Sequence, residues 1–212
     1  MDRVIIFDFD GVLANSIDPM LEYAQQVCEG LGYPCIPTQK DLEALEKMEF
    51  SEYGLQLGIP QEKIDEFVSQ NFEMFNTRKE PLALIPEMDN IVVQLANSAI
   101  LAVVTGNSRI VVNNFLRAHG LFGEFQKILC AEDKGNRVEK IFSLIALYDN
   151  PGREFYFVGD AVSDVRAAGE TGIKSVAVGW GHQSLSKLRK AGPDFVVDRP
   201  VDLISLFNEI KT

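Results

Sequence analysis

The most informative segment of this chain is residues 4–12, which read VIIFDFDGV. Alternate residues of a β-strand point to the same side, so Asp8 and Asp10 can face one pocket where an apolar strand ends. Open α/β sheets bind their ligands at that edge. Two crowded carboxylates are costly to bury, so the pair indicates a metal ion or two acids with divided roles, one ionised and one protonated. Because Asp and Gly also form ordinary turns, this segment alone leaves both interpretations open.

The composition disfavours some classes of partner. At 212 residues, with 46% hydrophobic and 24% charged residues, the chain fits one globular domain plus a modest insertion, or two small domains. Its formal net charge of −11 disfavours binding to nucleic acid or to an anionic membrane, because both need a basic surface. An anionic substrate would need positive charge concentrated at the site by a cation and a few lysines.

The cysteine pattern indicates a reducing compartment. Cys28, Cys35 and Cys130 lack CxxC spacing, which is typical of reduced thiols and gives no support for a zinc site. No segment has the length and hydropathy of a signal peptide or a membrane span, so we expect a cytoplasmic protein. His119 and His182 lie in no recognisable catalytic setting, and we therefore expect carboxylates to perform any acid–base chemistry.

Short apolar runs recur at the intervals of a parallel sheet. The predicted strands are residues 4–7, 100–104, 127–130, 155–158, 175–178 and 195–197. Most are continuously apolar, as strands buried on both faces should be. Helical patterns separate them at residues 89–98, 109–119 and 137–147. This alternation predicts an α/β fold, a Rossmann-like doubly wound parallel sheet with right-handed crossovers.

One segment breaks the alternation. Between Ser16 and Glu80 there is no convincing strand, and helical periodicity occurs at residues 17–31, 39–48 and 61–77. We therefore predict an α/β core domain made of residues 1–15 and 82–212. A small α-helical domain, residues 16–81, is inserted into it after the first strand.

Two later strand ends carry polar residues suited to the same pocket. Thr105, Gly106 and Asn107 offer a hydroxyl group and backbone amides that could hold a phosphate oxygen, although the same tripeptide also suits a plain helix cap. Lys134 follows another predicted strand, and only this context distinguishes it from an ordinary surface lysine.

The strongest downstream signal is Asp160, which follows the apolar run at residues 155–158. Asp164 lies four residues further on, in the first turn of a helix and on the same side. Two such carboxylates can bind Mg²⁺, which prefers oxygen ligands. Helix capping explains each acid separately, but it does not explain their coincidence with Asp8 and Asp10.

In this order, the segments around Asp8, Thr105, Lys134 and Asp160 resemble the four motifs of the haloacid dehalogenase superfamily, in its phosphatase branch. The helical insertion after the first strand is similar to the α-helical cap of the group that includes phosphoglycolate phosphatase and β-phosphoglucomutase. Residues 178–181 and 191–198 also resemble phosphoglycolate-phosphatase-like members, so the resemblance spans the whole chain.

The resemblance implies a role for each acid. Asp8 would be the nucleophile that attacks phosphorus and forms an aspartyl-phosphate. Asp10 would protonate the leaving oxygen and then deprotonate the hydrolytic water. Mg²⁺ would be held by the carboxylates of Asp8 and Asp160 and the backbone carbonyl of Asp10, with Asp164 ligating directly or through water.

The resemblance also implies a phosphate-binding set. Its members would be Gly11, Thr105, Gly106, Asn107 and Lys134. Lys134 would neutralise the transferring phosphoryl group and help to orient Asp8. It is followed by Gly135, where a proline is frequent in the family. Its separation from Asp160 has the length of one strand–helix unit, so Lys134 is preferred to Lys140 for this role.

The function expected from the resemblance is a Mg²⁺-dependent phosphatase acting on a small phosphorylated metabolite of the phosphoglycolate or sugar-phosphate type. A haloacid dehalogenase would not need Asp10, whereas a phosphomutase would share all four motifs. A phosphonoacetaldehyde hydrolase would need a cap lysine, for which Lys40, Lys47 and Lys63 are candidates. The non-enzyme alternative is a phosphorylation-switched binding module of the receiver type. Nothing in the sequence specifies the oligomeric state.

Overall fold

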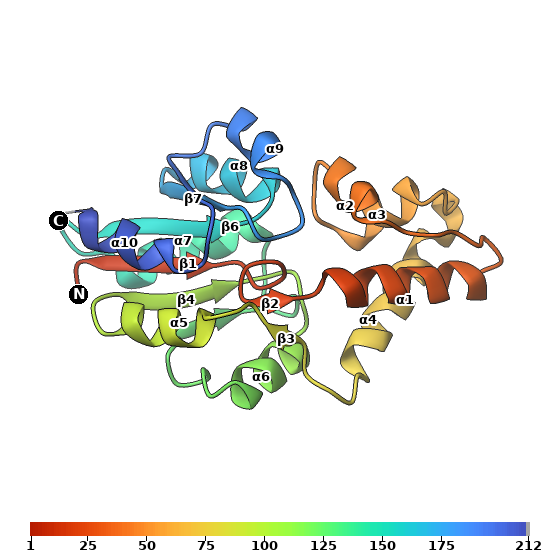
Figure 1. Cartoon of the computed structure of the whole chain (residues 1–212), viewed down its shortest axis with the longest axis horizontal. Coiled ribbons are helices and arrows are strands. Elements are labelled where there is room, and N and C mark those ends of the chain that lie inside the picture. Colours follow the sequence, from red (N-terminus) through yellow and green to blue (C-terminus); the bar gives the residue numbers. More distant parts are fainter. Residues whose placement is uncertain (211–212) are drawn as a thin grey trace.

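The computed structural model describes residues 1–210 and contains a six-stranded sheet in which every pair of neighbouring strands is parallel. The strand order is β5-β4-β1-β6-β7-β8 (Figure 1). The strands are β1 (Arg3–Phe7), β4 (Ile100–Val104), β5 (Lys127–Leu129), β6 (Glu154–Gly159), β7 (Lys174–Val178) and β8 (Phe195–Val197). This confirms the predicted α/β fold class.

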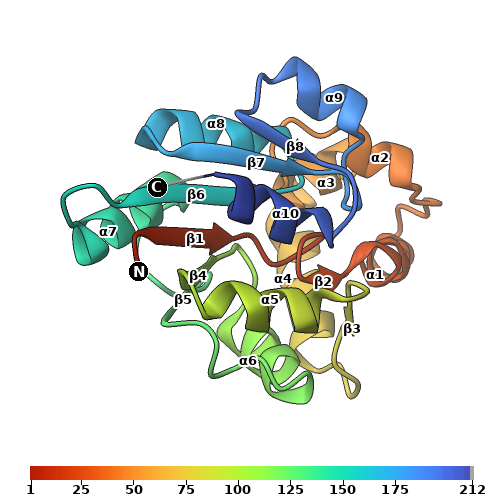
Figure 2. The same cartoon turned by 60° about the vertical axis from the view of Figure 1, so that its left-hand side comes forward.

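Helices cover both faces of this sheet (Figures 1 and 2). One face packs against α5 (Met88–Ala96), α6 (Arg109–Ala118) and α10 (Asp202–Glu209). The other face packs against α7 (Arg137–Tyr148), α8 (Val162–Thr171) and α9 (Leu185–Lys190). Strand β1 serves both layers, because Ile5 and Phe7 enter the first cluster while Val4 and Ile6 enter the second. Burial on both sides is the reason that the strand is continuously apolar.

The order in which the chain adds strands to the sheet reverses between β1 and β6. From β1 the chain continues to β4 and β5 on one side, and then returns to place β6 against the other side of β1. The helix after β6, α8, covers the face opposite to that covered by α5. Such a switch point opens a crevice at the carboxyl ends of the two strands. The residues that follow β1 and β6 are Asp8 and Asp160.

A helical lobe, residues 17–76, stands beyond this edge of the sheet (Figure 1). It consists of α1 (Ile17–Gly30), α2 (Gln39–Ala44), α3 (Phe50–Gln56), a short 3-10 turn η1 (Gln61–Lys63) and α4 (Ile64–Asn76). A separate apolar cluster that includes Val27, Leu42, Tyr53 and Phe67 holds these helices together. Two short antiparallel strands, β2 (Ala14–Asn15) and β3 (Ala83–Leu84), join the lobe to the sheet. The predicted domain boundaries, 1–15 with 82–212 and 16–81, stay an interpretation.

The lobe differs from its sequence pattern in one place. The helix expected over residues 39–48 ends at Ala44, because Leu45 adopts an extended conformation with φ −62° and ψ 141°. Its backbone carbonyl accepts hydrogen bonds from Gln183 and Lys187 of the α/β core, at 2.7 Å each. Contacts between distant parts of the chain therefore override a local helical periodicity. Helix α3, which was not expected, begins five residues further on.

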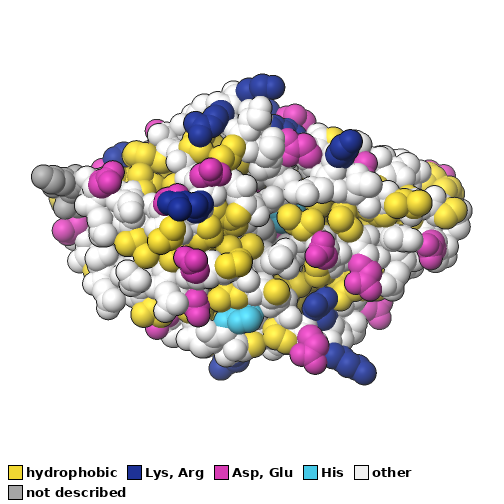
Figure 3. Space-filling view, in the orientation of Figure 1, with side chains coloured by type: hydrophobic (Ala, Val, Ile, Leu, Met, Phe, Trp, Pro, Cys, Tyr) yellow, Lys and Arg dark blue, Asp and Glu magenta, His cyan; other side chains and the backbone are white. Residues whose placement is uncertain are grey.

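The face drawn in Figure 3 does not carry charge of one sign only. Lys and Arg side chains are interspersed with Asp and Glu over the face drawn in Figure 3. Among the described residues, no helix has the length and hydropathy needed to cross a membrane.

Substitution of a buried residue of β1 tests the packing of the sheet against its helices. Ile5→Ala should lower the free energy of unfolding by about 2–5 kcal/mol, because Ile5 is fully buried under α5 and α10. The matched control Val93→Ala alters a side chain of α5 that is 45% exposed and should change this free energy by less than about 0.5 kcal/mol. Urea unfolding followed by circular dichroism measures both variants. Equal losses would contradict the assigned core.

Candidate active site

Asp8 and Asp10 leave the carboxyl end of β1 on one side of the crevice. Asp8 is 5% exposed, and its Oδ1 accepts a hydrogen bond of 2.7 Å from the backbone amide of Phe9. Asp10 is half-buried, and its two carboxylate oxygens accept hydrogen bonds of 3.3 and 3.1 Å from the Nδ2 group of Asn107. The first strand thus delivers two carboxylates to one cavity, as the sequence pattern predicts.

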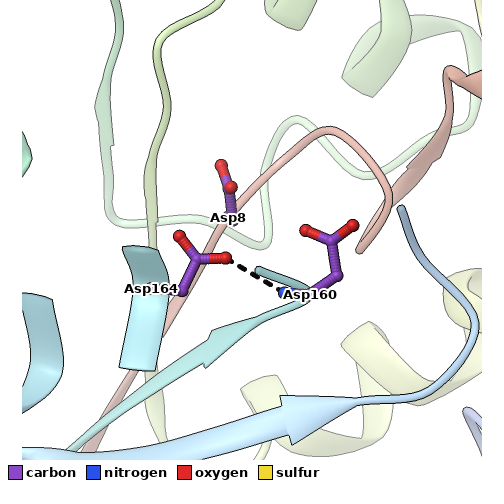
Figure 4. A group of neighbouring side chains, drawn as sticks. All are labelled: Asp8, Asp160 and Asp164. Carbon is purple, nitrogen blue, oxygen red and sulfur yellow. Dashed lines mark hydrogen bonds between the residues drawn. The ribbon is translucent and has the colours of Figure 1, made fainter. Parts of the chain in front are cut away.

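Asp160 and Asp164 approach from the other side of the crevice. Asp160 follows β6, and Asp164 lies in the first turn of α8. Oδ2 of Asp164 accepts hydrogen bonds of 3.0 Å from the backbone amides of Asp160 and Ala161. One oxygen each of Asp8, Asp160 and Asp164 lies within 4.8 Å of the other two, and all three residues are buried (Figure 4).

Two glycines make room for Asp160. A Cβ atom at Gly11 would lie 2.1 Å from Oδ2 of Asp160, and one at Gly181 would lie 2.2 Å from the same oxygen. Gly11 also has a φ of +73°, a conformation that side chains other than glycine rarely adopt. The predicted site residue Gly11 therefore contacts the acidic group directly, with its backbone packed against the carboxylate.

The positive charge beside these acids comes from Arg137. Its guanidinium lies 3.2 Å from Oδ2 of Asp8 and forms an ion pair with Oδ1 of Asp164. Arg137 is the first residue of α7, where the helix dipole disfavours a cation. The nearby carboxylates offset this unfavourable position. A cation at the first position of a predicted helix is the signal by which the sequence could have identified Arg137.

The structure does not bring Lys134 into this group. Lys134 is exposed, and within residues 1–210 it forms no ion pair with the four aspartates and does not line their cavity. The other candidate, Lys140, is buried and donates a hydrogen bond of 2.6 Å to the carbonyl of Cys130. The positive charge expected from Lys134 therefore comes from Arg137, three residues later. The chain brings a basic side chain up to the acids only at the start of α7.

The Thr105–Asn107 segment lies where it was expected, at the carboxyl end of β4. Thr105 is 2% exposed, and its hydroxyl oxygen accepts a 3.0 Å hydrogen bond from the backbone amide of Asn107. Thr105, Gly106 and Asn107 all line the cavity that contains Asp8 and Asp10. Ser108 caps α6, which frees the side chain of Asn107 to reach Asp10.

His182 requires a correction, because it lies inside the site. Its Nδ1 is 2.6 Å from Oδ2 of Asp160, and its backbone amide donates to the same oxygen at 2.5 Å. Its Nε2 is 3.3 Å from the hydroxyl of Ser16. His182 is 2% exposed and lines the cavity. No local pattern indicated this role, because His182 follows Asp160 by a whole helix–strand unit, α8 and β7.

Burial and the neighbouring charges shift several pKa values. Burial raises the pKa of Asp8, although the guanidinium of Arg137 opposes this shift. Burial and the negative charge of Asp8 raise the pKa of Asp10 to about 6. Burial lowers the pKa of His182, but the carboxylate of Asp160 outweighs this effect and the resulting pKa is raised. A carboxyl group with a pKa of about 6 can both donate and accept a proton near neutral pH.

The donor set fits a divalent metal ion. Asp8, Asp160 and Asp164 supply oxygen ligands from three elements, and carboxylate oxygens are the ligands that hard divalent cations prefer. Arg137 and His182 are the only basic side chains that line this cavity among the described residues, against the carboxylates of Asp8, Asp10 and Asp160 in its wall. A bound cation would offset the remaining repulsion.

The cavity continues from these acids into the helical lobe. Its volume is about 360 Å³, within the range of small-molecule sites. The lobe contributes a mostly apolar wall, whose members include Met20, Met48, Phe50, Val68, Phe72 and Phe75. Phe50 and Phe72 pack edge to face, with ring centroids 5.3 Å apart.

The segment after His182 fastens the lobe to the core. Gln183 is 1% exposed; its Oε1 accepts from the backbone amide of Val162 at 2.8 Å, and its Nε2 donates to the carbonyl of Leu45 at 2.7 Å. Ser184 donates two hydrogen bonds of 2.6 Å to the carboxylate of Glu43. The lobe therefore covers the crevice through contacts made by residues that adjoin the acidic site.

The chain is similar in sequence to two named phosphatases and in fold to a solved hydrolase structure. The chain is 25% identical over 209 residues to a phosphoglycolate phosphatase of Synechococcus elongatus, with 98% of each chain covered. It is 26% identical over 216 residues to a pyrophosphatase of Anoxybacillus flavithermus, with 96% of each covered. A haloacid dehalogenase-like family hydrolase of Streptococcus pneumoniae has the same fold, with a TM-score of 0.83 at 19% identity over 96% of this chain and 97% of that chain.

A match to a protein-family model identifies the family of this chain. The model of haloacid dehalogenase-like hydrolases matches residues 5–178, which include Asp8, Thr105, Arg137 and Asp160. The match covers most of the chain and begins in β1, the strand that carries the first two acids. The chain therefore belongs to the haloacid dehalogenase-like hydrolase family.

Proposed function

We propose that this protein is a Mg²⁺-dependent phosphatase that hydrolyses a small phosphorylated metabolite through an aspartyl-phosphate intermediate. The observation that carries the proposal is the meeting of Asp8, Asp160 and Asp164 oxygens within 4.8 Å, beside Asp10 and Arg137. The names of the relatives, a phosphoglycolate phosphatase and a pyrophosphatase, also point to phosphoryl compounds. Phosphoglycolate and sugar phosphates are therefore the first substrates to assay. The three free cysteines fit a cytoplasmic enzyme.

In the proposed reaction, a carboxylate oxygen of Asp8 attacks phosphorus in line with the leaving oxygen. The bond from phosphorus to the leaving oxygen breaks as the bond to Asp8 forms, and Asp10 donates its proton to that oxygen. Asp10 then takes a proton from a water molecule that attacks the phosphorus. This second step releases inorganic phosphate and regenerates the carboxylate of Asp8.

Other residues would hold the transferring group. The carboxylates of Asp8, Asp160 and Asp164, with the backbone carbonyl of Asp10, would bind Mg²⁺. The ion would supply the positive charge that lets an anionic nucleophile approach an anionic phosphate. We propose that Arg137, in place of Lys134, neutralises the phosphoryl oxygens. The hydroxyl group of Thr105 and the amides that follow it would bind the same oxygens.

The helical lobe would act as a cap that excludes water and contacts the leaving group. A phosphonoacetaldehyde hydrolase would need a lysine facing this space. Among the described residues, the cavity that contains Asp8 is lined by none of the three candidates, Lys40, Lys47 and Lys63. Lys47 lines only an adjoining cavity. A phosphomutase would use the same catalytic groups, and activation by an added sugar bisphosphate would identify it.

Replacing the nucleophile tests the covalent step. Asp8→Asn should reduce phosphate release by about 10³-fold or more, because an amide cannot accept the phosphoryl group. Asp149→Asn removes an equal charge from an exposed residue and should retain full activity. A phosphate-release screen over phosphorylated metabolites, with Mg²⁺ and with EDTA, provides the measurement. Full activity of Asp8→Asn, or equal activity in EDTA, would contradict the proposed chemistry.

Two variants test which basic side chain neutralises the phosphoryl group, Arg137 or Lys134. Arg137→Ala should lower kcat/KM about 10²- to 10³-fold, because it removes a positive group that contacts Asp8. Lys134→Ala should alter kcat/KM less than about threefold, since its side chain is exposed. Steady-state kinetics on one substrate compare the two variants. A larger loss in Lys134→Ala would restore the lysine to the role that the sequence suggested.

The raised pKa of Asp10 has a consequence for stability in the absence of metal. Below about pH 4, Asp10 is mostly protonated in both the folded and the unfolded state and contributes little. Between about pH 4 and pH 6 the unfolded state releases its proton while the folded state retains it, so the free energy of unfolding falls through this range and levels off above it. Asp10→Asn should therefore stabilise the metal-free protein at pH 7 by on the order of 2 kcal/mol, and much less at pH 4.

The measurement is urea unfolding in EDTA at both pH values. Asp149→Asn serves as the control for removal of one negative charge. A stabilisation by Asp10→Asn that is the same at pH 4 and pH 7 would show that the carboxyl group is not the cause.

A further inference from the structure

We propose that the substrate of this site is the phosphate monoester of an apolar alcohol whose leaving group carries no anion. This inference rests on the proposed phosphatase function and concerns the half of the cavity that would hold the leaving group. It separates this chain from the substrate named for its relative, phosphoglycolate, whose leaving group bears a carboxylate.

The position of Asp10 fixes where the leaving group must lie. If Asp10 protonates the leaving oxygen, that oxygen lies within hydrogen-bond reach of its carboxyl group. Asp10 lines the cavity of about 360 Å³ that extends into the helical lobe, and it does not line the adjoining cavity, which Arg137 also lines. The body of the leaving group therefore occupies the space between Asp10 and the lobe.

The lobe side of this space is apolar and aromatic. Phe72 and Val68 of α4 line it together with Phe50, the first residue of α3. Phe75, one helical turn beyond Phe72, is buried and lies 6.0 Å from the ring of Phe50. Aromatic rings at this spacing offer both faces and edges to an apolar ligand.

The charged groups on the lobe side are negative. Glu49 and Asp65 line the cavity, and both residues are exposed. In the part of the chain that the structure describes, the only basic side chains in this cavity are Arg137 and His182, which already pair with Asp8, Asp164 and Asp160. A carboxylate on the leaving group would face Glu49 and Asp65 without a counter-ion, which is unfavourable.

The basic residues of the lobe, Lys40 among them, and Arg78 in the segment that follows it lie outside this cavity. The ammonium of Lys63 pairs with Glu66 at 2.8 Å, and Arg78 donates to the hydroxyl of Tyr23 at 2.8 Å. Lys47 lines the adjoining cavity, beside Arg137 and Arg166. None of these three lines the cavity that contains Asp10. The lobe thus offers apolar surface and negative charge where a glycolate carboxylate would need a cation.

A matched pair of esters tests the inference. Benzyl phosphate and 4-carboxybenzyl phosphate differ by one carboxylate, and 2-phosphoglycolate adds the small anionic substrate. With Mg²⁺ present, kcat/KM for benzyl phosphate should exceed the values for both anionic esters by about tenfold or more. Equal or higher kcat/KM for either anionic ester would overturn the inference and leave the phosphatase function intact.

Failure of the proposed function gives a different result. If none of the three esters releases phosphate, and a wider panel of phosphorylated metabolites also fails with Mg²⁺, the phosphatase assignment is wrong and the inference falls with it. Hydrolysis confined to anionic metabolites would overturn the inference alone.

A charge placed in the lobe should change the preference. Val68→Lys puts a cation in the cavity and should raise kcat/KM for 4-carboxybenzyl phosphate relative to benzyl phosphate by about tenfold. Ser69→Lys adds the same charge to the neighbouring residue of α4, which is exposed and outside the cavity, and should leave the ratio unchanged. Circular dichroism confirms that each variant is folded.

A second substitution keeps the test valid if Val68→Lys does not fold. Asp65→Asn removes a negative charge from the cavity wall and should raise the same ratio about threefold, mainly through KM. Glu73→Gln, an exposed site on α4 outside the cavity, is its control. An unchanged ratio in Asp65→Asn, or an equal change in its control, would contradict the role of charge in this part of the cavity.

Discussion

Mutual repulsion among buried carboxylates is the constraint on which this molecule depends. Asp8, Asp160 and Asp164 are almost fully buried, and Asp10 lies beside them. Such a group is stable only if positive charge or bound protons compensate it. The protein supplies Arg137 from the start of α7 and His182 from the segment after β7, and burial raises the pKa values of Asp8 and Asp10. The remaining negative charge would favour the binding of a divalent cation at this site.

The sequence predicted the parts of the fold that depend on local patterns. Strands buried on both faces produce unbroken apolar runs, and all six strands of the main sheet were located to within a residue at either end. The acids at the ends of β1 and β6 could be placed together because the carboxyl ends of parallel strands share one edge. Family resemblance then added the order of the motifs, which no single pattern contains.

The sequence could not predict the features set by contacts between distant residues. The helix at residues 39–48 stops at Ala44 because core side chains bind the carbonyl of Leu45. The cation beside Asp8 is Arg137, and the spacing of the motif favoured Lys134, since loop geometry decides which side chain reaches inward. His182 reaches Asp160 across 22 residues of sequence, a separation that periodicity does not encode.

The side chain of Gln183 links two parts of the protein that the chain itself keeps far apart. One end of its amide holds the first turn of α8, the helix that carries Asp164, and the other end holds the backbone of the lobe at Leu45. A swing of the lobe away from the sheet must therefore break this bridge or pull on the start of that helix. Movement of the lobe would therefore be coupled mechanically to the turn that carries the carboxylate of Asp164, through one uncharged side chain that belongs to neither.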